Sequence, residues 1–152
     1  MKRSKEIKGV FYFFLFLILF FIFINNFFIY KVSGKSMSPT LNDGDIILVF
    51  KEKKCAVGDI VVFFSVEKGD NKKLVKRVEG RGGMYVSFEK GGKFINISEK
   101  KTGKAYKIPK GFCFVVGDNF NYSFDSREGW LVNERLIIGK VVLRVYPFKL
   151  FF

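Results

Sequence analysis

One apolar stretch near the N-terminus dominates the pattern of hydrophobic and polar positions along this chain. Residues 9–30 contain no charged side chain, and nine of the 21 phenylalanines lie among them. A helix that rises about 1.5 Å per residue crosses the hydrocarbon of a bilayer with about 20 apolar residues. The stretch therefore predicts a transmembrane anchor over residues 9–30, preceded by a short cytoplasmic tail of residues 1–8.

A cleavable signal peptide is the alternative for this stretch, since residues 32–34 offer a marginal small-residue cleavage site. The apolar region of a signal peptide is usually only about 7–15 residues long, which favours the anchor. Basic side chains outnumber the single acid Glu6 before the run: Lys2, Arg3, Lys5 and Lys8. By the positive-inside rule, the N-terminus is expected in the cytoplasm and residues 31–152 on the outer face of the cytoplasmic membrane.

Beyond residue 31 the pattern changes to short runs of β-branched and aromatic residues separated by glycine turns. The runs expected as strands are Ile46–Phe50, Ile60–Phe64, Leu74–Val78, Met84–Phe88, Phe94–Ile97, Phe112–Val116 and Ile137–Val145. Helical periodicity is absent from this part of the sequence. Residues 31–152 are therefore expected as one extracytoplasmic, mainly β domain, a barrel or folded sheet, with a small hairpin insertion at about 84–108.

Composition narrows the possible chemistry. The chain contains no histidine, which excludes the Ser-His-Asp triad and every mechanism with imidazole as the base. A carboxylate or a lysine would have to act instead. The net charge of +13 raises nucleic acid as a partner. No nucleic-acid-binding motif accompanies the charge, and a basic surface beside anionic lipid headgroups is the better interpretation.

The two cysteines, Cys55 and Cys113, lie 58 residues apart and lack the CxxC spacing of zinc sites. No metal site is predicted from them. One long-range disulfide is left open.

The first candidate site directly follows the apolar stretch, at Ser33–Leu41, with the sequence SGKSMSPTL. A phosphate-binding loop would need a glycine where Ile29 stands, so the Gly-Lys-Ser here is not one. A turn rich in serine and threonine is ordinary by itself. Two further blocks accompany it, LVKRVEG at Leu74–Gly80 and GDNFNYSFDSR at Gly117–Arg127.

Together these blocks resemble the bacterial type I signal peptidases, membrane-anchored serine proteases with a Ser/Lys dyad. The blocks follow an N-terminal anchor in the order of that family, with Gly58–Phe63 between the first two and Ile138–Val141 near the end. The resemblance covers nearly the whole chain. It implies a signal-peptidase-type folded sheet or barrel, removal of signal peptides from secreted preproteins, and no metal or cofactor.

The surroundings of Lys76 can be compared with what a lysine base requires. A lysine takes a proton from a serine hydroxyl only when it is neutral, so its pKa must fall from about 10.4. In a strand, Lys76 would share a face with Leu74 and Val78, while Arg77 points away. Burial among aliphatic side chains lowers the pKa of a lysine. The alternative is an exposed surface lysine, which is common in so basic a chain.

The resemblance implies that Ser36 is the nucleophile and Lys76 the general base. It further implies that a serine hydroxyl orients the lysine amine and that an ion pair and an acid hold the same segment. These supporting residues are Ser123, Asp125, Arg127 and Asp118. The backbone N–H of Ser36 is expected to stabilise the oxyanion. The second oxyanion donor is left open, because Gly34 stands where some members carry a hydroxyl.

The short distance in sequence from the apolar stretch places Ser36 at the membrane surface. Secretory preproteins present their cleavage sites there, with small residues just before the cut. The family binds this segment as an added β-strand. Met37, Leu74 and Val75 are the candidates for lining the substrate pockets.

Three alternatives accompany this hypothesis. A specialised processing peptidase of the conjugation or accessory type, with few substrates, would share the same residues. The self-cleaving repressor-type peptidases also use a Ser/Lys dyad on a similar fold, but they are soluble, and the predicted span argues against them. An inactive membrane-tethered binding module would have no physical need for Ser36, Lys76 and Ser123 together.

Overall fold

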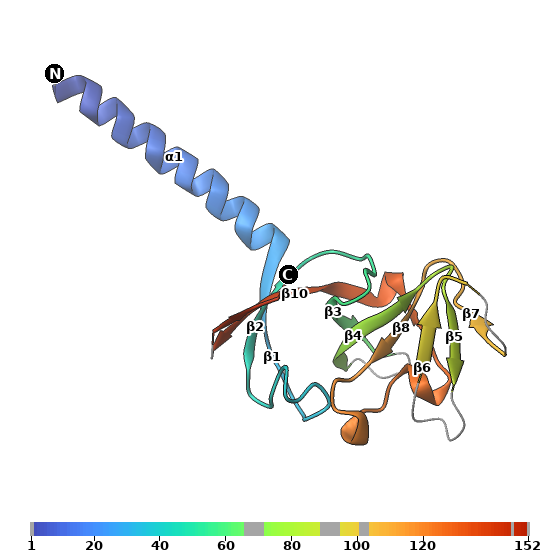
Figure 1. The fold of residues 1–152 in the computed structure, drawn as a ribbon. Helices are drawn as coiled ribbons and strands as arrows, with labels where there is room; N and C mark the ends of the chain where they lie inside the picture. The colour runs from blue at the N-terminus through green and yellow to red at the C-terminus, as the bar shows by residue number, and fades with distance from the viewer. Residues whose placement is uncertain (1, 66–71, 89–94, 101–103, 147, 152) are drawn as a thin grey trace.

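The computed structural model describes residues 2–65, 72–88, 95–100, 104–146 and 148–151, and it contains one N-terminal helix followed by two antiparallel sheets (Figure 1). The elements in chain order are α1 (Lys2–Asn26), β1 (Phe27–Lys31), β2 (Ile46–Phe50), β3 (Ile60–Phe64), β4 (Lys73–Arg81), β5 (Tyr85–Phe88), β6 (Ile95–Ser98), β7 (Tyr106–Lys107), β8 (Phe112–Val116), β9 (Val132–Asn133), β10 (Ile137–Tyr146) and β11 (Lys149–Leu150). Short 3-10 turns lie at Phe120–Tyr122, Ser126–Glu128 and Glu134–Leu136. The prediction of a mainly β fold preceded by one apolar helix is confirmed.

The helix α1 ends at Asn26, where several hydrogen bonds satisfy its last carbonyl groups. The side-chain amides of Asn25 and Asn26 each donate at 2.8 Å to a carbonyl one turn earlier. Lys51 donates its backbone N–H to Asn26 O and its ammonium to Asn25 O, both at 2.8 Å. A positive charge at the C-terminus of a helix is favourable, because the exposed carbonyl groups carry partial negative charge.

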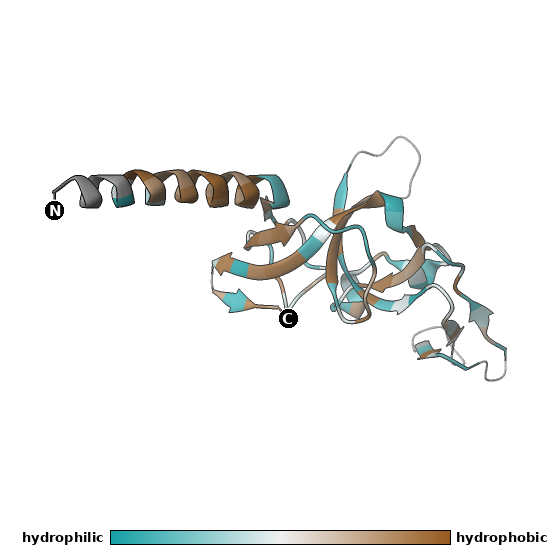
Figure 2. Cartoon of the chain, turned by 90° about the horizontal axis from the view of Figure 1, so that it is seen from above, coloured by the Kyte–Doolittle hydropathy of each residue, from teal (hydrophilic) through white to brown (hydrophobic). Residues whose placement is uncertain are grey.

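The apolar stretch of residues 9–30, predicted as one helix, is therefore divided between a helix and a strand. The helical part long and apolar enough to span a membrane is Lys8–Asn26, and it stands apart from the sheets as an apolar rod (Figure 2). The rest forms β1, which pairs with β2 in the register Phe27↔Phe50 to Lys31↔Ile46. Aromatic and β-branched residues such as those of β1 suit a strand as well as a membrane helix, so hydrophobicity alone did not mark the boundary.

The larger sheet has the strand order β1-β2-β10-β3-β4-β8-β9, with β11 paired to β10. The long strand β10 lies between β2 and β3 and joins the two halves of the sheet. The strand β4, which carries Lys76, lies between β3 and β8 and is therefore central. A central strand has both neighbours hydrogen-bonded, so the backbone around Lys76 is held on both sides.

A smaller sheet of order β6-β5-β7 lies beside β8 (Figure 1). Its strands fall within residues 84–108, where a hairpin insertion was predicted, and the two-residue strand β7 is a third strand that the sequence pattern did not indicate. Val86 and Ile108 pack with Phe114 and Val116 of β8, which fixes the small sheet against the large one.

Two further apolar clusters fill the large sheet, one on each side of β4. The first joins the β1–β2 connection to the sheet through Met37, Leu41 and Val75. The second contains Phe63 and Val78, with Leu74 packed against it. The candidate catalytic strand therefore presents apolar side chains to two separate cores.

Candidate active site

Ser36 lies in the connection between β1 and β2, in a turn whose ends are fastened to each other. The backbone N–H of Val32 donates to Asp45 O at 2.8 Å, and Gly44 N–H donates to Val32 O at 2.9 Å. Met37, the next residue, is 1% exposed and packs in the core beneath the turn. Burial of Met37 holds the turn down, while Ser36 remains partly exposed.

An ion pair fastens the same turn to β10. The carboxylate of Asp45 accepts Arg144 Nη1 at 2.9 Å and the backbone N–H of Asn42 at 2.8 Å. The pair is nearly buried, with side-chain exposures of 13% for Arg144 and 8% for Asp45. This turn, which we name the nucleophile turn after the role expected of Ser36, is thus tied to a strand about 100 residues away in the chain.

Lys76 lies in the middle of β4, opposite Val61 of β3, and its side chain is almost completely buried, at 4% exposed. Leu74 and Val78, which share its face of the strand, pack in the cluster around Phe63. This burial lowers the pKa of Lys76 to about 8, with the charge of Asp125 opposing the shift and that of Arg127 assisting it. Lys76 forms no ion pair with any described residue.

Ser123, Asp125 and Arg127 form one hydrogen-bonded network. Ser123 Oγ donates to Asp125 Oδ2 at 2.6 Å, and Arg127 donates to both carboxylate oxygens, at 2.8 and 2.9 Å. The backbone N–H of Gly117 adds a bond of 2.9 Å to Oδ2. Burial alone would raise the pKa of Asp125, but these donors hold the pKa below its usual value. The predicted Asp125–Arg127 pair is therefore present, and its arginine binds the carboxylate whose charge acts on Lys76.

Gly117 is the point at which the three predicted segments meet. The register of β4 with β8 pairs Arg77 with Val116, which brings Lys76 level with Gly117. A Cβ built on Gly117 would overlap the side chain of Ser123 and lie 2.5 Å from Ser36 O. Only a residue without a side chain fits here, so Gly117 allows the nucleophile turn and the Ser123 segment to approach Lys76. Within the described residues, neither the Ser36 hydroxyl nor the Lys76 amine forms a hydrogen bond.

Asp118 belongs to a different pair, on the opposite face of β4. Arg77 donates Nε and Nη2 to the two oxygens of Asp118 at 2.9 and 2.7 Å, and Nη1 to Gly58 O at 2.9 Å. Both side chains are mostly buried. Arg77 was not among the predicted site residues. Its position directly after Lys76, on the opposite face of the same strand, was a signal that could have identified it.

Asn119 is a second residue that the sequence reasoning passed over. Its backbone N–H donates to Ser36 O at 3.0 Å, and its side-chain Nδ2 donates to Lys35 O at 3.0 Å. It therefore contacts the carbonyl groups on both sides of the Ser36 backbone. The signal available was its place in the Gly-Asp-Asn block, but the contact joins residues 84 positions apart and could not be read from spacing.

The three candidates for lining substrate pockets divide between the two cores. Met37 and Val75 pack together in the cluster beneath the nucleophile turn, where they are 1% and 8% exposed. Leu74 is partly buried against the other cluster. The structure thus brings Met37 and Val75 together and separates Leu74 from them.

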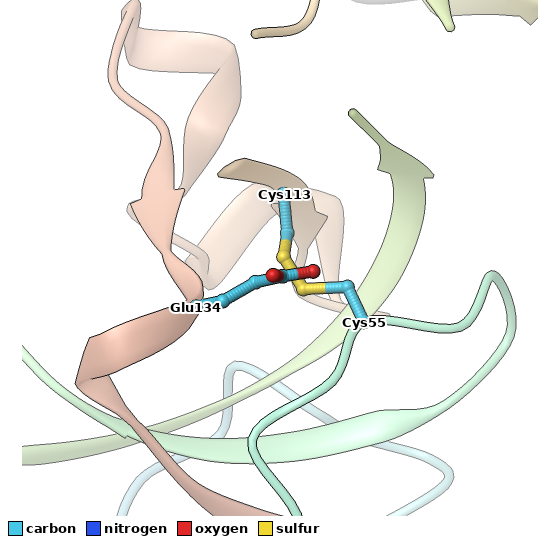
Figure 3. Close-up of side chains that lie close together, drawn as sticks. All are labelled: Cys55, Cys113 and Glu134. Atoms are coloured by element: carbon cyan, nitrogen blue, oxygen red, sulfur yellow. A yellow bond between two sulfur atoms is a disulfide. The ribbon is translucent and has the colours of Figure 1, made fainter. Parts of the chain in front are cut away.

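Cys55 and Cys113 are joined in a disulfide, which settles the question that the sequence left open (Figure 3). The carboxylate of Glu134 lies close to both sulfurs, and the three ligand atoms fall within 4.8 Å of one another. A metal would need both sulfurs as thiolates. The disulfide removes those ligands, so the group acts as a link between the segment before β3 and strand β8.

Known proteins match this chain over most of its length, including the segments that form the candidate site. A family model described as "Signal peptidase, peptidase S26" matches residues 6–107 and 93–146. "Signal peptidase I" of Bacillus caldolyticus is 34% identical over 161 residues, covering 86% of this chain and 84% of that protein. "Signal peptidase I V" of Bacillus subtilis is 35% identical, over 74% of this chain and 82% of the relative. "Signal peptidase IB" of Staphylococcus aureus is 32% identical, over 80% of this chain and 79% of the relative.

Proposed function

The chain belongs to the signal peptidase family, peptidase S26, and from this we propose that it removes signal peptides through a dyad in which Ser36 is the nucleophile and Lys76 the general base. The observation that carries the proposal is the environment of Lys76. A lysine with a pKa of about 8 is neutral in a useful fraction of molecules near neutral pH. Burial, with no ion pair to any residue that the structure describes, gives the Lys76 side chain the lowered pKa that the reaction needs.

The reaction then proceeds in two steps. Neutral Lys76 takes the proton from Ser36 Oγ as that oxygen attacks the scissile carbonyl carbon. The backbone N–H of Ser36 donates to the oxyanion, and it has no acceptor among the described residues that would compete. The Lys76 ammonium gives the proton to the departing amine, and water then cleaves the acyl-enzyme with Lys76 again as the base.

The supporting residues have distinct roles in this proposal. Arg127 neutralises Asp125, so that the carboxylate does not draw a full positive charge onto Lys76. Asp125 in turn holds Ser123, whose hydroxyl orients the amine. Asp118 anchors the same segment through Arg77.

The substrates would be secretory preproteins with small residues before the cleavage site, bound as an added strand beside the nucleophile turn. Met37, Leu74 and Val75 are the proposed lining. Small substrate side chains suit a site whose proposed lining includes Met37 and Val75, which belong to one buried cluster and are only 1% and 8% exposed.

The proposed location is the cytoplasmic membrane, with α1 crossing the bilayer, the N-terminus in the cytoplasm and the β domain on the outer face. The direct passage from α1 into β1 leaves no linker between the helix and the sheet, which supports a β domain held close to the membrane. Ser36 then lies near the membrane surface, where preproteins emerge.

The test is cleavage of a purified preprotein by the full-length chain in detergent, followed across pH. Ser36→Ala and Lys76→Ala should both be inactive, and wild-type activity should rise with pH through about 8 as Lys76 loses its proton. Ser38→Ala is the matched control, since Ser38 lies in the same turn but bonds to Asn42. Activity retained in Ser36→Ala or Lys76→Ala would disprove the dyad.

A further inference from the structure

We propose that Asn119 is a positioning residue that orients and polarises the peptide group between Lys35 and Ser36, and so sets the strength of the oxyanion donor. The inference rests on the proposed function, because it takes Ser36 N–H as that donor. Asn119 itself would touch neither the substrate nor the reacting atoms.

The geometry begins with the two carbonyl groups that flank the Ser36 backbone. Asn119 N–H donates to Ser36 O at 3.0 Å, and Asn119 Nδ2 donates to Lys35 O at 3.0 Å. Lys35 O belongs to the same peptide group as Ser36 N–H. A peptide group is planar, so fixing the direction of its carbonyl also fixes the direction of its N–H.

The same hydrogen bond changes the strength of the donor. Lys35 O accepts two bonds, one from Asn119 Nδ2 and one from Ser38 N–H at 3.2 Å. Donors at a carbonyl oxygen polarise the peptide group and make its N–H a better donor. The effect is greatest in the transition state, when the oxyanion carries its charge.

The Asn119 side chain binds Lys35 O and does not cap the 3-10 turn that follows it. Asn119 precedes the 3-10 turn Phe120–Tyr122, where an asparagine commonly accepts a backbone N–H as a cap, but it makes no such bond. Asn133 occupies the matching position before Glu134–Leu136 and does cap its turn, accepting Arg135 N–H at 2.9 Å. Two asparagines in equivalent local settings therefore use their side chains differently.

The nucleophile turn has enough other support to keep its fold without the Asn119 side chain. Ser38 N–H still donates to Lys35 O, and the Asn119 backbone N–H still donates to Ser36 O. Gly34 N–H remains bonded to Asp43 Oδ1 at 2.8 Å. Removal of Nδ2 should thus affect the peptide group more than the turn.

The experiment compares full-length wild type with Asn119→Ala, which removes the amide donor, and with the isosteric Asn119→Asp, which keeps the volume but replaces the donor with a charged acceptor. We expect kcat for a preprotein to fall about tenfold or more in both variants, with KM within about twofold of wild type. In Asn119→Ala the pH at half-maximal activity should stay in place, because the substitution changes no charge and leaves Lys76 untouched.

A pair of substrate-like peptides separates positioning from general damage. A peptide aldehyde forms a tetrahedral adduct when Ser36 Oγ gives its proton to Lys76 and bonds to the carbonyl carbon, whose oxygen becomes the oxyanion. The matching peptide alcohol forms none. Asn119→Ala should weaken aldehyde binding by about the factor lost in kcat and leave alcohol binding unchanged. Asn133→Ala is the control, with wild-type kcat and aldehyde affinity expected.

Several results would overturn the inference. They are a kcat within about twofold of wild type, equal losses for aldehyde and alcohol, or unfolding of both Asn119 variants under conditions where wild type is folded. Activity in Ser36→Ala would instead defeat the proposed dyad. If Ser36→Ala and Lys76→Ala are inactive while Asn119→Ala keeps the wild-type kcat, only the positioning role fails.

Discussion

Lys76 and Arg77 are neighbours on β4, but their side chains lie on opposite faces of the strand and their charges have opposite environments. Lys76 is buried among apolar side chains without an ion pair among the described residues, and its pKa falls to about 8. Arg77 binds both oxygens of Asp118, and this hydrogen bonding raises its pKa further above the ordinary value. A cation deprived of a partner becomes reactive, whereas a cation with a complete partner holds the structure.

Two Asp–Arg ion pairs explain why Arg77 has a carboxylate partner and Lys76 has none among the described residues. Asp118 is bound by Arg77, on the face away from Lys76. Asp125 lies near enough to Lys76 to influence its pKa, but Arg127 binds it instead. The fold thus supplies Asp118 and Asp125 with an arginine each and gives Lys76 no ion pair within the described part of the chain. The following substitutions test this contrast, from the largest expected effect to the smallest.

Lys76→Met should abolish cleavage and stabilise the fold at neutral pH. Loss of the base should lower activity about a thousandfold or more. In wild type the pKa of Lys76 is about 8 in the folded state and 10.5 in the unfolded state. The buried charge therefore lowers the free energy of unfolding by its full amount below pH 8. This penalty disappears as the pH rises to 10.5. The variant should gain about 1–3 kcal/mol at pH 7.

Denaturant unfolding at pH 7 and above pH 10.5 checks the second half of this prediction. The stability gain of Lys76→Met should shrink at the higher pH. A variant that is less stable than wild type at pH 7 would show that Lys76 is held by interactions other than burial.

Arg127→Gln should move the pH profile of activity to higher pH. Its positive charge lowers the pKa of Lys76, and its removal also leaves Asp125 free to stabilise the lysine ammonium. Both effects raise the pKa, so activity at pH 7 should fall about tenfold and recover partly at alkaline pH. Initial rates between pH 6 and pH 10 measure the shift, and an unmoved profile would contradict it.

Arg77→Gln is the matched change on the other face and should alter stability without moving the profile. It leaves the Asp118 carboxylate without its two guanidinium donors, which costs about 1–2 kcal/mol. Thermal unfolding measures the loss. A pH shift as large as that of Arg127→Gln would show that the two faces of β4 are electrostatically coupled.

Lys140→Gln should have the smallest effect, because its ion pair is the most exposed of the four described here. Lys140 Nζ lies 3.0 Å from Asp59 Oδ1, and its side chain is 30% exposed. Such pairs contribute less than about 1 kcal/mol. Unfolding in low and high salt should differ little between this variant and wild type.

Local pattern was enough to predict much of the sheet. The strands β2, β3 and β8 have the predicted bounds, since short β-branched runs between glycine turns have few other stable forms. Alternation along β4 correctly separated Lys76 from Arg77. The end of α1 was placed too late, because the bonds from Lys51 that fix it come from a later segment.

The candidate site also contains residues that local pattern identified and residues that it missed. Ser36, Lys76 and the Ser123 segment were identified from their blocks, and the pair of Asp125 with Arg127 was implied by the family resemblance. Arg77 and Asn119 were missed, since their importance lies in bonds to Asp118 and Lys35, 41 and 84 positions away. Spacing along a chain does not report such contacts.

The sequence by itself determined the apolar helix, the mainly β fold and the residue types available for chemistry, including the absence of histidine. Periodicity and composition act over a few residues, and these properties depend on nothing longer. Only the tertiary structure decided that Arg77 binds Asp118 and Arg127 binds Asp125, where Asn119 directs its amide, and that Lys76 pairs with none of the residues that the structure describes. Those choices follow from the order of strands in the sheet, which brings Gly117 beside both Ser36 and Ser123 and withdraws Lys76 from water.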